Sequence, residues 1–266
     1  MLAYERRGAG EPLVLLHGIT HRRQAWYPVA DHLAEQREVI LVDLPGHGES
    51  PSLRPGAEPP GERMVADLLD LFAELGLERP HVAGNSLGGR LGLELAALGA
   101  ARSVTALSPA GFWRTPAEFR YTASLFRSVM ALAGALDPHA ARLLRTRAGR
   151  AALFFWINSR PTWLSPEAAL GDFKGLLRAR PEVTEFFAES APFTAEMPAD
   201  VPVIVAWAQR DLVLPLYQAK VARTLLPHAE HIVLPGCGHV PMNDDPYRVA
   251  TTILRGSRPT PVKNAA

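Results

Sequence analysis

The stretch from Val82 to Gly89, V-A-G-N-S-L-G-G, places the pattern G-x-S-x-G between an apolar run and a helical pattern. This arrangement is typical of a sharp turn from a strand into a helix, because small residues on both sides of the serine let the backbone fold tightly. Such a turn would expose the Oγ of Ser86 above the sheet, beside a helix N-terminus that stabilises negative charge. A glycine-rich loop without a catalytic role gives the same pattern. Other parts of the sequence are therefore needed to distinguish a catalytic serine turn from such a loop.

Short apolar runs, most of them ending in glycine or proline, recur along the chain and alternate with helical patterns. The runs lie at residues 13–16, 38–43, 81–84, 104–108, 201–206 and 231–234. The helical patterns lie at residues 25–36, 62–75, 87–98, 216–225 and 246–254. Apolar strands that alternate with helices predict an α/β fold, with a doubly wound, mostly parallel sheet that helices cover on both faces.

Between residues 112 and 193 the alternation stops. This stretch has only helical segments, at 124–136, 138–155, 166–178 and 181–190, and it contains 13 of the 20 aromatic residues. An aromatic-rich helical insertion predicts a lid that walls an apolar pocket, although the same aromatics could simply fix the insertion to the core. We therefore predict a core at 1–111 and 194–256, a lid at 112–193, and a flexible tail at 257–266.

The composition argues against several classes of protein. The net charge of +1 provides no basic stripe for nucleic acid, and no apolar run reaches the length of about 18 residues that spans a membrane. The single cysteine, Cys237, precludes an intramolecular disulfide, and the N-terminus lacks a signal-peptide pattern, so we expect a cytoplasmic protein. We expect no metal and no cofactor, because neither a histidine pair with ligand spacing nor a P-loop occurs. The expected partners are a small-molecule substrate and possible further copies of the chain.

Two later loops supply partners for the serine. Asp211 follows one apolar run and His239 follows the next, so both should lie with Ser86 at the carboxyl edge of the sheet. A serine hydroxyl needs a general base, and the base needs an orienting carboxylate. The order Ser86, Asp211, His239 is the order expected when G-x-S-x-G forms a nucleophile elbow. The sequence therefore predicts a catalytic triad.

The first apolar run ends at His17-Gly18, which predicts a turn beside the serine loop. We expect the backbone N–H groups of Ile19 and Leu87 to form an oxyanion hole. His17 is expected to shape the turn through hydrogen bonds. His21, which precedes two arginines, is expected at the solvated surface.

Taken together, these motifs resemble the α/β-hydrolase superfamily. The matching segments are Leu15–Gly18, Asp43–Ser50, Gly84–Gly89, the Asp211 loop and Gly238-His239. The resemblance implies the α/β-hydrolase fold with a lid inserted after the sixth strand, and a cofactor-independent Ser-His-Asp hydrolase. Relatives that open epoxides or remove halogens carry an aspartate as nucleophile. Ser86 therefore favours hydrolysis of an acyl bond.

Two substrate classes remain open, and the candidate substrate contacts are Gly18, Asn85, Trp113 and Val240. The aromatic-rich lid favours a carboxylic ester with an apolar or aromatic portion. The Asn85-Ser86 pair is similar to the elbow of carbon–carbon bond hydrolases, which cleave vinylogous 1,5-diketones from ring fission. Those enzymes usually carry tryptophan after the catalytic histidine, where this chain has Val240. A non-catalytic binding protein is the third possibility, and the complete triad argues against it.

Overall fold

A computed structural model describes residues 1–258 and contains a seven-stranded sheet with the order β1-β3-β2-β4-β5-β6-β7. The strands are β1 (Tyr4–Arg7), β2 (Pro12–Leu16), β3 (Glu38–Val42), β4 (His81–Asn85), β5 (Ser103–Leu107), β6 (Val203–Ala208) and β7 (Glu230–Leu234). β1 pairs antiparallel with β3, and the other neighbouring strands are parallel. The predicted doubly wound, mostly parallel sheet is thus confirmed.

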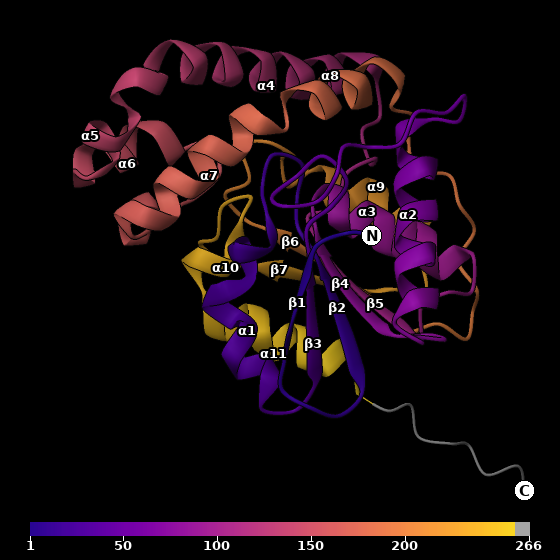
Figure 1. Ribbon diagram of the computed structural model, residues 1–266. Coiled ribbons are helices and arrows are strands. Elements are labelled where there is room, and N and C mark those ends of the chain that lie inside the picture. Colours follow the sequence, from indigo (N-terminus) through magenta and orange to yellow (C-terminus); the bar gives the residue numbers. More distant parts are fainter. Residues whose placement is uncertain (259–266) are drawn as a thin grey trace, which may run out of the picture.

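The inner strands are buried because helices cover both faces of the sheet. The core helices are α1 (Tyr27–Ala34), α2 (Pro60–Glu74), α3 (Leu87–Ala97), α9 (Gln218–Leu225), α10 (Pro241–Asp244) and α11 (Pro246–Gly256), and a 3-10 turn, η1 (Arg23–Trp26), precedes α1. α1 and α11 pack against each other on one face, and α2 and α3 cover the other face (Figure 1). In α2 the apolar side chains Met64, Leu68 and Leu71 recur at helical spacing and are buried.

The segment from residue 112 to 193, here called the insertion, connects β5 to β6 and lies above the carboxyl edge of the sheet (Figure 1). Its elements are α4 (Pro116–Leu136), η2 (Asp137–His139), α5 (Ala140–Leu144), α6 (Arg147–Phe154), η3 (Pro161–Trp163), α7 (Pro166–Arg178) and α8 (Arg180–Glu189). Caps explain where two of the helices begin. The side chains of Thr115 and Ser165 accept backbone hydrogen bonds at the starts of α4 and α7, and a proline follows each of them.

The position of the insertion along the chain differs from the prediction. It was expected after the sixth strand, but within residues 1–258 it follows the fifth, β5. The sheet has only one strand, β1, before the strand that ends at His17-Gly18.

Ser257, which directly follows α11, contacts the side chain of Arg37. Ser257 is buried, and its Oγ and carbonyl oxygen accept hydrogen bonds from the Arg37 guanidinium at 3.2 and 2.5 Å. The predicted tail began at residue 257, and its residues 259–266 lie outside the described residues. Among residues 1–258, no helix combines the length and the apolar composition that crossing a membrane requires.

Candidate active site

Ser86 occupies a strained turn between β4 and α3. Its φ of 55° and ψ of −114° are unfavourable for a residue with a side chain. The flanking glycines permit this turn through close backbone approach. A Cβ at Gly84 would overlap the Gly88 carbonyl, and a Cβ at Gly88 would overlap the Leu16 carbonyl of the neighbouring strand β2. The G-x-S-x-G pattern is therefore explained by packing around a sharp turn.

Backbone hydrogen bonds hold the serine in this conformation. The Ser86 N–H donates to the Leu107 carbonyl at 2.9 Å, and the Ser86 carbonyl accepts from the N–H groups of Arg90 (3.1 Å) and Ala110 (3.0 Å). These bonds tie the turn to the end of β5 and to the first turn of α3. A strained conformation persists where its surroundings determine it in this way.

His239 and Asp211 form a buried pair at the ends of β7 and β6. The Nδ1–H of His239 donates to Asp211 Oδ2 at 2.7 Å. The second oxygen, Asp211 Oδ1, accepts from the N–H groups of Val213 (2.9 Å) and Leu214 (2.8 Å), so the carboxylate is fixed. A proton held on Nδ1 leaves Nε2 of His239 as the nitrogen that can accept a proton.

Asn85 connects this pair to the serine turn. Its Nδ2 donates to the His239 carbonyl at 2.9 Å and to the Leu107 carbonyl at 3.2 Å. Both hydrogens of the amide nitrogen are thus used within the protein. The three residues predicted as a triad are brought to one edge of the sheet, and Asn85 acts as a structural tie between them.

The predicted oxyanion turn lies beside Ser86. A Cβ at Gly18 would lie 3.2 Å from the Ser86 Cβ, so glycine permits the close approach. The turn Gly18–His21 is closed by a hydrogen bond from the His21 N–H to the Gly18 carbonyl at 3.0 Å, and Thr20 within it has a φ of 79°. The two predicted donors are both buried next to this region, Ile19 inside the turn and Leu87 at the start of α3.

His17 fixes the start of the turn through two hydrogen bonds. Its Nε2 accepts a hydrogen bond from the Leu44 N–H at 3.0 Å, so its Nδ1–H donates to the Gly18 carbonyl at 2.8 Å. Burial lowers the pKa of His17 well below its usual range. A neutral histidine with both nitrogens occupied has a structural role, as the sequence predicted.

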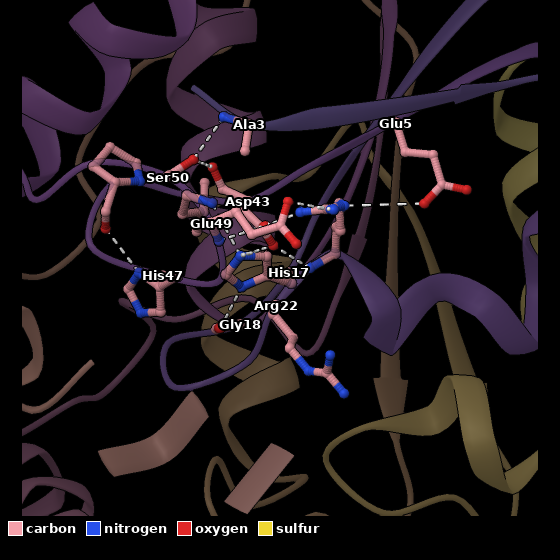
Figure 2. A network of polar contacts seen from close by, with 12 residues as sticks. Ala3, Glu5, His17, Gly18, Arg22, Asp43, His47, Glu49 and Ser50 are labelled. Atoms are coloured by element: carbon pink, nitrogen blue, oxygen red, sulfur yellow. Dashed lines mark hydrogen bonds and ion pairs between the residues drawn. The ribbon is translucent and has the colours of Figure 1, made fainter. Parts of the chain in front are cut away.

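Asp43 organises the neighbouring loop after β3 (Figure 2). Its carboxylate accepts from the backbone N–H groups of Arg23 (2.6 Å) and Glu49 (3.0 Å) and pairs with the Arg23 guanidinium. Figure 2 also shows that the side chain of Arg22 points away from this cluster. Consecutive arginines therefore extend in different directions.

The prediction that His21 lies at the solvated surface is wrong. The insertion covers this residue, and its side chain is buried. Burial, followed by the proximity of His239, lowers the pKa of His21 to about 4. It is a neutral group close to the predicted base.

A cavity of about 200 Å³ lies between α4, α6 and α7 and reaches the oxyanion turn. Most of its wall is aliphatic or aromatic. Its polar residues are Thr20 and His21 from the turn, Ser128 from α4 and Asp172 from α7. Burial raises the pKa of the Asp172 carboxyl to about 6. Residues of the aromatic-rich insertion thus form most of the wall of this apolar cavity, which reaches the oxyanion turn at Thr20 and His21 but is not lined by Ser86 or His239.

None of the four predicted substrate contacts lines this cavity. Trp113 stacks on Phe119 with ring centroids 4.9 Å apart. Val240 is buried, and its N–H donates to the Ile157 carbonyl of the insertion at 2.9 Å. Of the other two candidates, Gly18 lies against Ser86, and Asn85 makes the tie described above.

Asp244 is a residue that the sequence analysis missed. Its carboxylate accepts from the backbone N–H groups of Gly238 (2.7 Å), Ser159 (2.9 Å) and Arg160 (2.8 Å). It thus joins the loop that carries His239 to the insertion. No local pattern signals this role, because the insertion residues that Asp244 binds are about 85 positions away in the chain.

Within residues 1–258, no group of three or more histidine, cysteine, aspartate or glutamate side chains could hold a metal ion. Burial raises the pKa of the Cys237 thiol to about 11, so the thiol is protonated at neutral pH. Cys237 is therefore a packed side chain.

Comparison with known proteins identifies the family of this chain. A model of the alpha/beta hydrolase family matches residues 13–252, and the chain belongs to this family. Lipase 1 of Psychrobacter immobilis is 27% identical over an alignment of 277 residues, covering 97% of this chain and 82% of that protein. Lipase 3 of Moraxella sp. is 27% identical over 245 residues, covering 88% and 73%.

A solved structure of a thermophilic esterase from Thermogutta terrifontis, with malate bound, has a TM-score of 0.71 to this chain. The two are 26% identical, and the match covers 96% of this chain and 92% of the esterase. The family assignment confirms the predicted α/β-hydrolase fold and the prediction that the protein is a hydrolase.

Proposed function

We propose that the protein is a serine hydrolase that cleaves carboxylic esters with an apolar portion. The observation that carries this proposal is the fixed His239–Asp211 pair at the same sheet edge as the strained Ser86 turn. The relatives named as lipase or esterase support an ester as substrate.

In the proposed mechanism, Ser86 Oγ attacks the ester carbonyl and gives its proton to Nε2 of His239. The N–H groups of Ile19 and Leu87 stabilise the oxyanion, and Asp211 stabilises the imidazolium. Collapse of the tetrahedral intermediate expels the alcohol, which takes the proton from His239. His239 then removes a proton from water, which attacks the acyl-enzyme. Collapse of the second tetrahedral intermediate releases the acid, and His239 returns the proton to Ser86 Oγ.

The cavity between α4, α6 and α7 is the proposed site for the apolar portion, and the insertion is the proposed lid over it. An apolar cavity of about 150 Å³ binds benzene, so about 200 Å³ accommodates an aryl group or a medium-length alkyl chain. The alternative of carbon–carbon bond cleavage rested mainly on Asn85. Its amide nitrogen is engaged by two protein carbonyls, so we favour the ester.

The nucleophile is tested by labelling with a fluorophosphonate probe and by hydrolysis of p-nitrophenyl butyrate. The wild type should be labelled and active, and Ser86→Ala should lose labelling and at least a thousandfold in kcat. Ser52→Ala, which removes an exposed serine hydroxyl far from the site in the chain, is the control and should behave as the wild type. Equal labelling of the wild type and Ser86→Ala would refute the proposal.

A further inference from the structure

The oxyanion turn contains a strained residue of its own, Thr20. Thr20 is the third residue of the turn Gly18–His21, and its φ of 79° lies in the region that favours glycine. A β-branched side chain is especially unfavourable there. Such a conformation persists only where neighbouring structure holds it.

Helix α7 of the insertion packs directly on the turn through two glycines. A Cβ at Gly175 would lie 3.3 Å from the Thr20 carbonyl oxygen, and a Cβ at Gly171 would overlap the Arg22 guanidinium. Residues four positions apart share one face of a helix, so Gly171 and Gly175 form a flat surface against the turn. No side chain at these two positions separates α7 from residues 20–22.

Asp172, between these glycines, holds the residue that follows the turn. Arg22 Nε lies 3.6 Å from Asp172 Oδ1, and the Asp172 side chain is 10% exposed. Arg22 Nε is itself buried and makes no hydrogen bond within residues 1–258. The adjacent Arg23 pairs with Asp43 of the core instead. The end of the oxyanion turn is therefore fixed between the core and α7.

We infer that helix α7 positions the oxyanion hole, and that Asp172 is a positioning residue which acts through Arg22 on the turn that carries the Ile19 N–H. This inference rests on the proposed function, since it requires that N–H as an oxyanion donor. If α7 no longer holds the turn, Thr20 relaxes and the donor moves away from the developing charge. A displacement of about 1 Å in such a site costs about a hundredfold in rate.

Two variants weaken the tie in different ways. Asp172→Asn removes the charge that faces Arg22. Gly171→Ala displaces the Arg22 guanidinium by volume alone, while alanine favours the helix. Both should lower kcat for p-nitrophenyl butyrate by about ten- to a hundredfold, with KM changed less than threefold. The control is Asp137→Asn, because Asp137 pairs with Lys174 of the same helix at 2.6 Å and both of these side chains are more exposed than Asp172. Its kcat should stay within twofold of wild type.

Rescue separates positioning from a merely structural role. Glycine adopts a positive φ without strain, so Thr20→Gly added to Asp172→Asn should keep the turn in place without help from α7 and raise kcat at least fivefold. A kcat of Asp172→Asn equal to that of the control would overturn the inference, and so would a loss that Thr20→Gly leaves unchanged. These results are distinct from failure of the proposed function, which would appear as activity or labelling that does not depend on Ser86.

Discussion

At the scale of single residues, Asp172 should contribute to activity while reducing stability at neutral pH. Its pKa is raised to about 6 by burial, above the ordinary value of 3.8, so between these pH values the folded protein binds a proton that the unfolded chain has lost. Its contribution to the free energy of unfolding therefore falls as pH rises through this window, by up to about 1.4 kcal/mol per pH unit. The charged Asp172 carboxylate next to Arg22 therefore lowers the free energy of unfolding at neutral pH.

Urea unfolding at pH 4, 5, 6 and 7 tests this prediction. The stability of Asp172→Asn relative to wild type should increase from pH 4 to pH 6 and then level off, because the variant lacks the titrating group. Asp137→Asn removes a carboxylate that is more exposed and is the control. Parallel pH profiles for wild type and Asp172→Asn would contradict the prediction.

The catalytic candidates could be predicted because their signals are local. Ser86 is flanked by its own small residues, and Asp211 and His239 each follow an apolar run closely. The roles of His21 and Asp172 could not be predicted in the same way. Their burial depends on α7 packing on the oxyanion turn, about 150 residues along the chain, and no sequence pattern records that contact.

At the scale of secondary-structure elements, apolar periodicity located six of the seven strands. The missed strand, β1, has the sequence Tyr-Glu-Arg-Arg and lies at the edge of the sheet, where polar side chains remain partly exposed. Helix α10, with four residues, is too short to show a helical period. Breaks between short helices are also missed by periodicity. In the insertion, the single helix predicted at 138–155 is divided into η2, α5 and α6.

Helix α4 should determine which acyl chains the proposed active site accepts. Ala133 is buried in the cavity wall, so Ala133→Leu would fill space that a medium-length chain needs. Excluding two or three methylenes costs about 2 kcal/mol, which corresponds to about thirtyfold in kcat/KM. The expected result is this loss for p-nitrophenyl octanoate, with p-nitrophenyl acetate changed less than twofold.

The matched control for this helix is Ala131→Leu, because Ala131 is exposed on α4 two residues earlier. It should leave the ratio of octanoate to acetate turnover unchanged. If Ala133→Leu lowered both esters equally, the cavity between α4, α6 and α7 would not be the acyl site.

At the scale of the whole molecule, the insertion and the core meet at the proposed catalytic edge. Asp244 binds backbone groups of the insertion and of the His239 loop at once. Farther from the serine turn, Arg63 of α2 pairs with Glu185 of α8. The insertion is therefore attached to the core on several sides of the site. Three histidines of the core loops, His17, His21 and His47, are buried.

These histidines should make the fold sensitive to acid. Burial lowers the pKa of His21 and of His47 to about 4. It also lowers the pKa of His17 well below its usual range. The unfolded chain binds protons at these positions below pH about 6.5, whereas the folded protein does not. The free energy of unfolding therefore decreases as pH falls from about 6.5 to 4, by up to about 1.4 kcal/mol per pH unit for each histidine. Asp172 has the opposite effect, because its carboxyl binds a proton in the folded protein below pH about 6.

Urea unfolding across this range should therefore show a free energy of unfolding that rises with pH. His47→Gln should reduce the slope by close to one proton, because His47 uses its Nδ1 to bond the Pro45 carbonyl at 2.8 Å and carries no charge when folded. His228→Gln, at an exposed position, is the control and should keep the slope of the wild type. If His47→Gln had the same slope as the wild type, His47 would be charged in the folded protein. Its surroundings would then not exclude water, contrary to its burial in the structure.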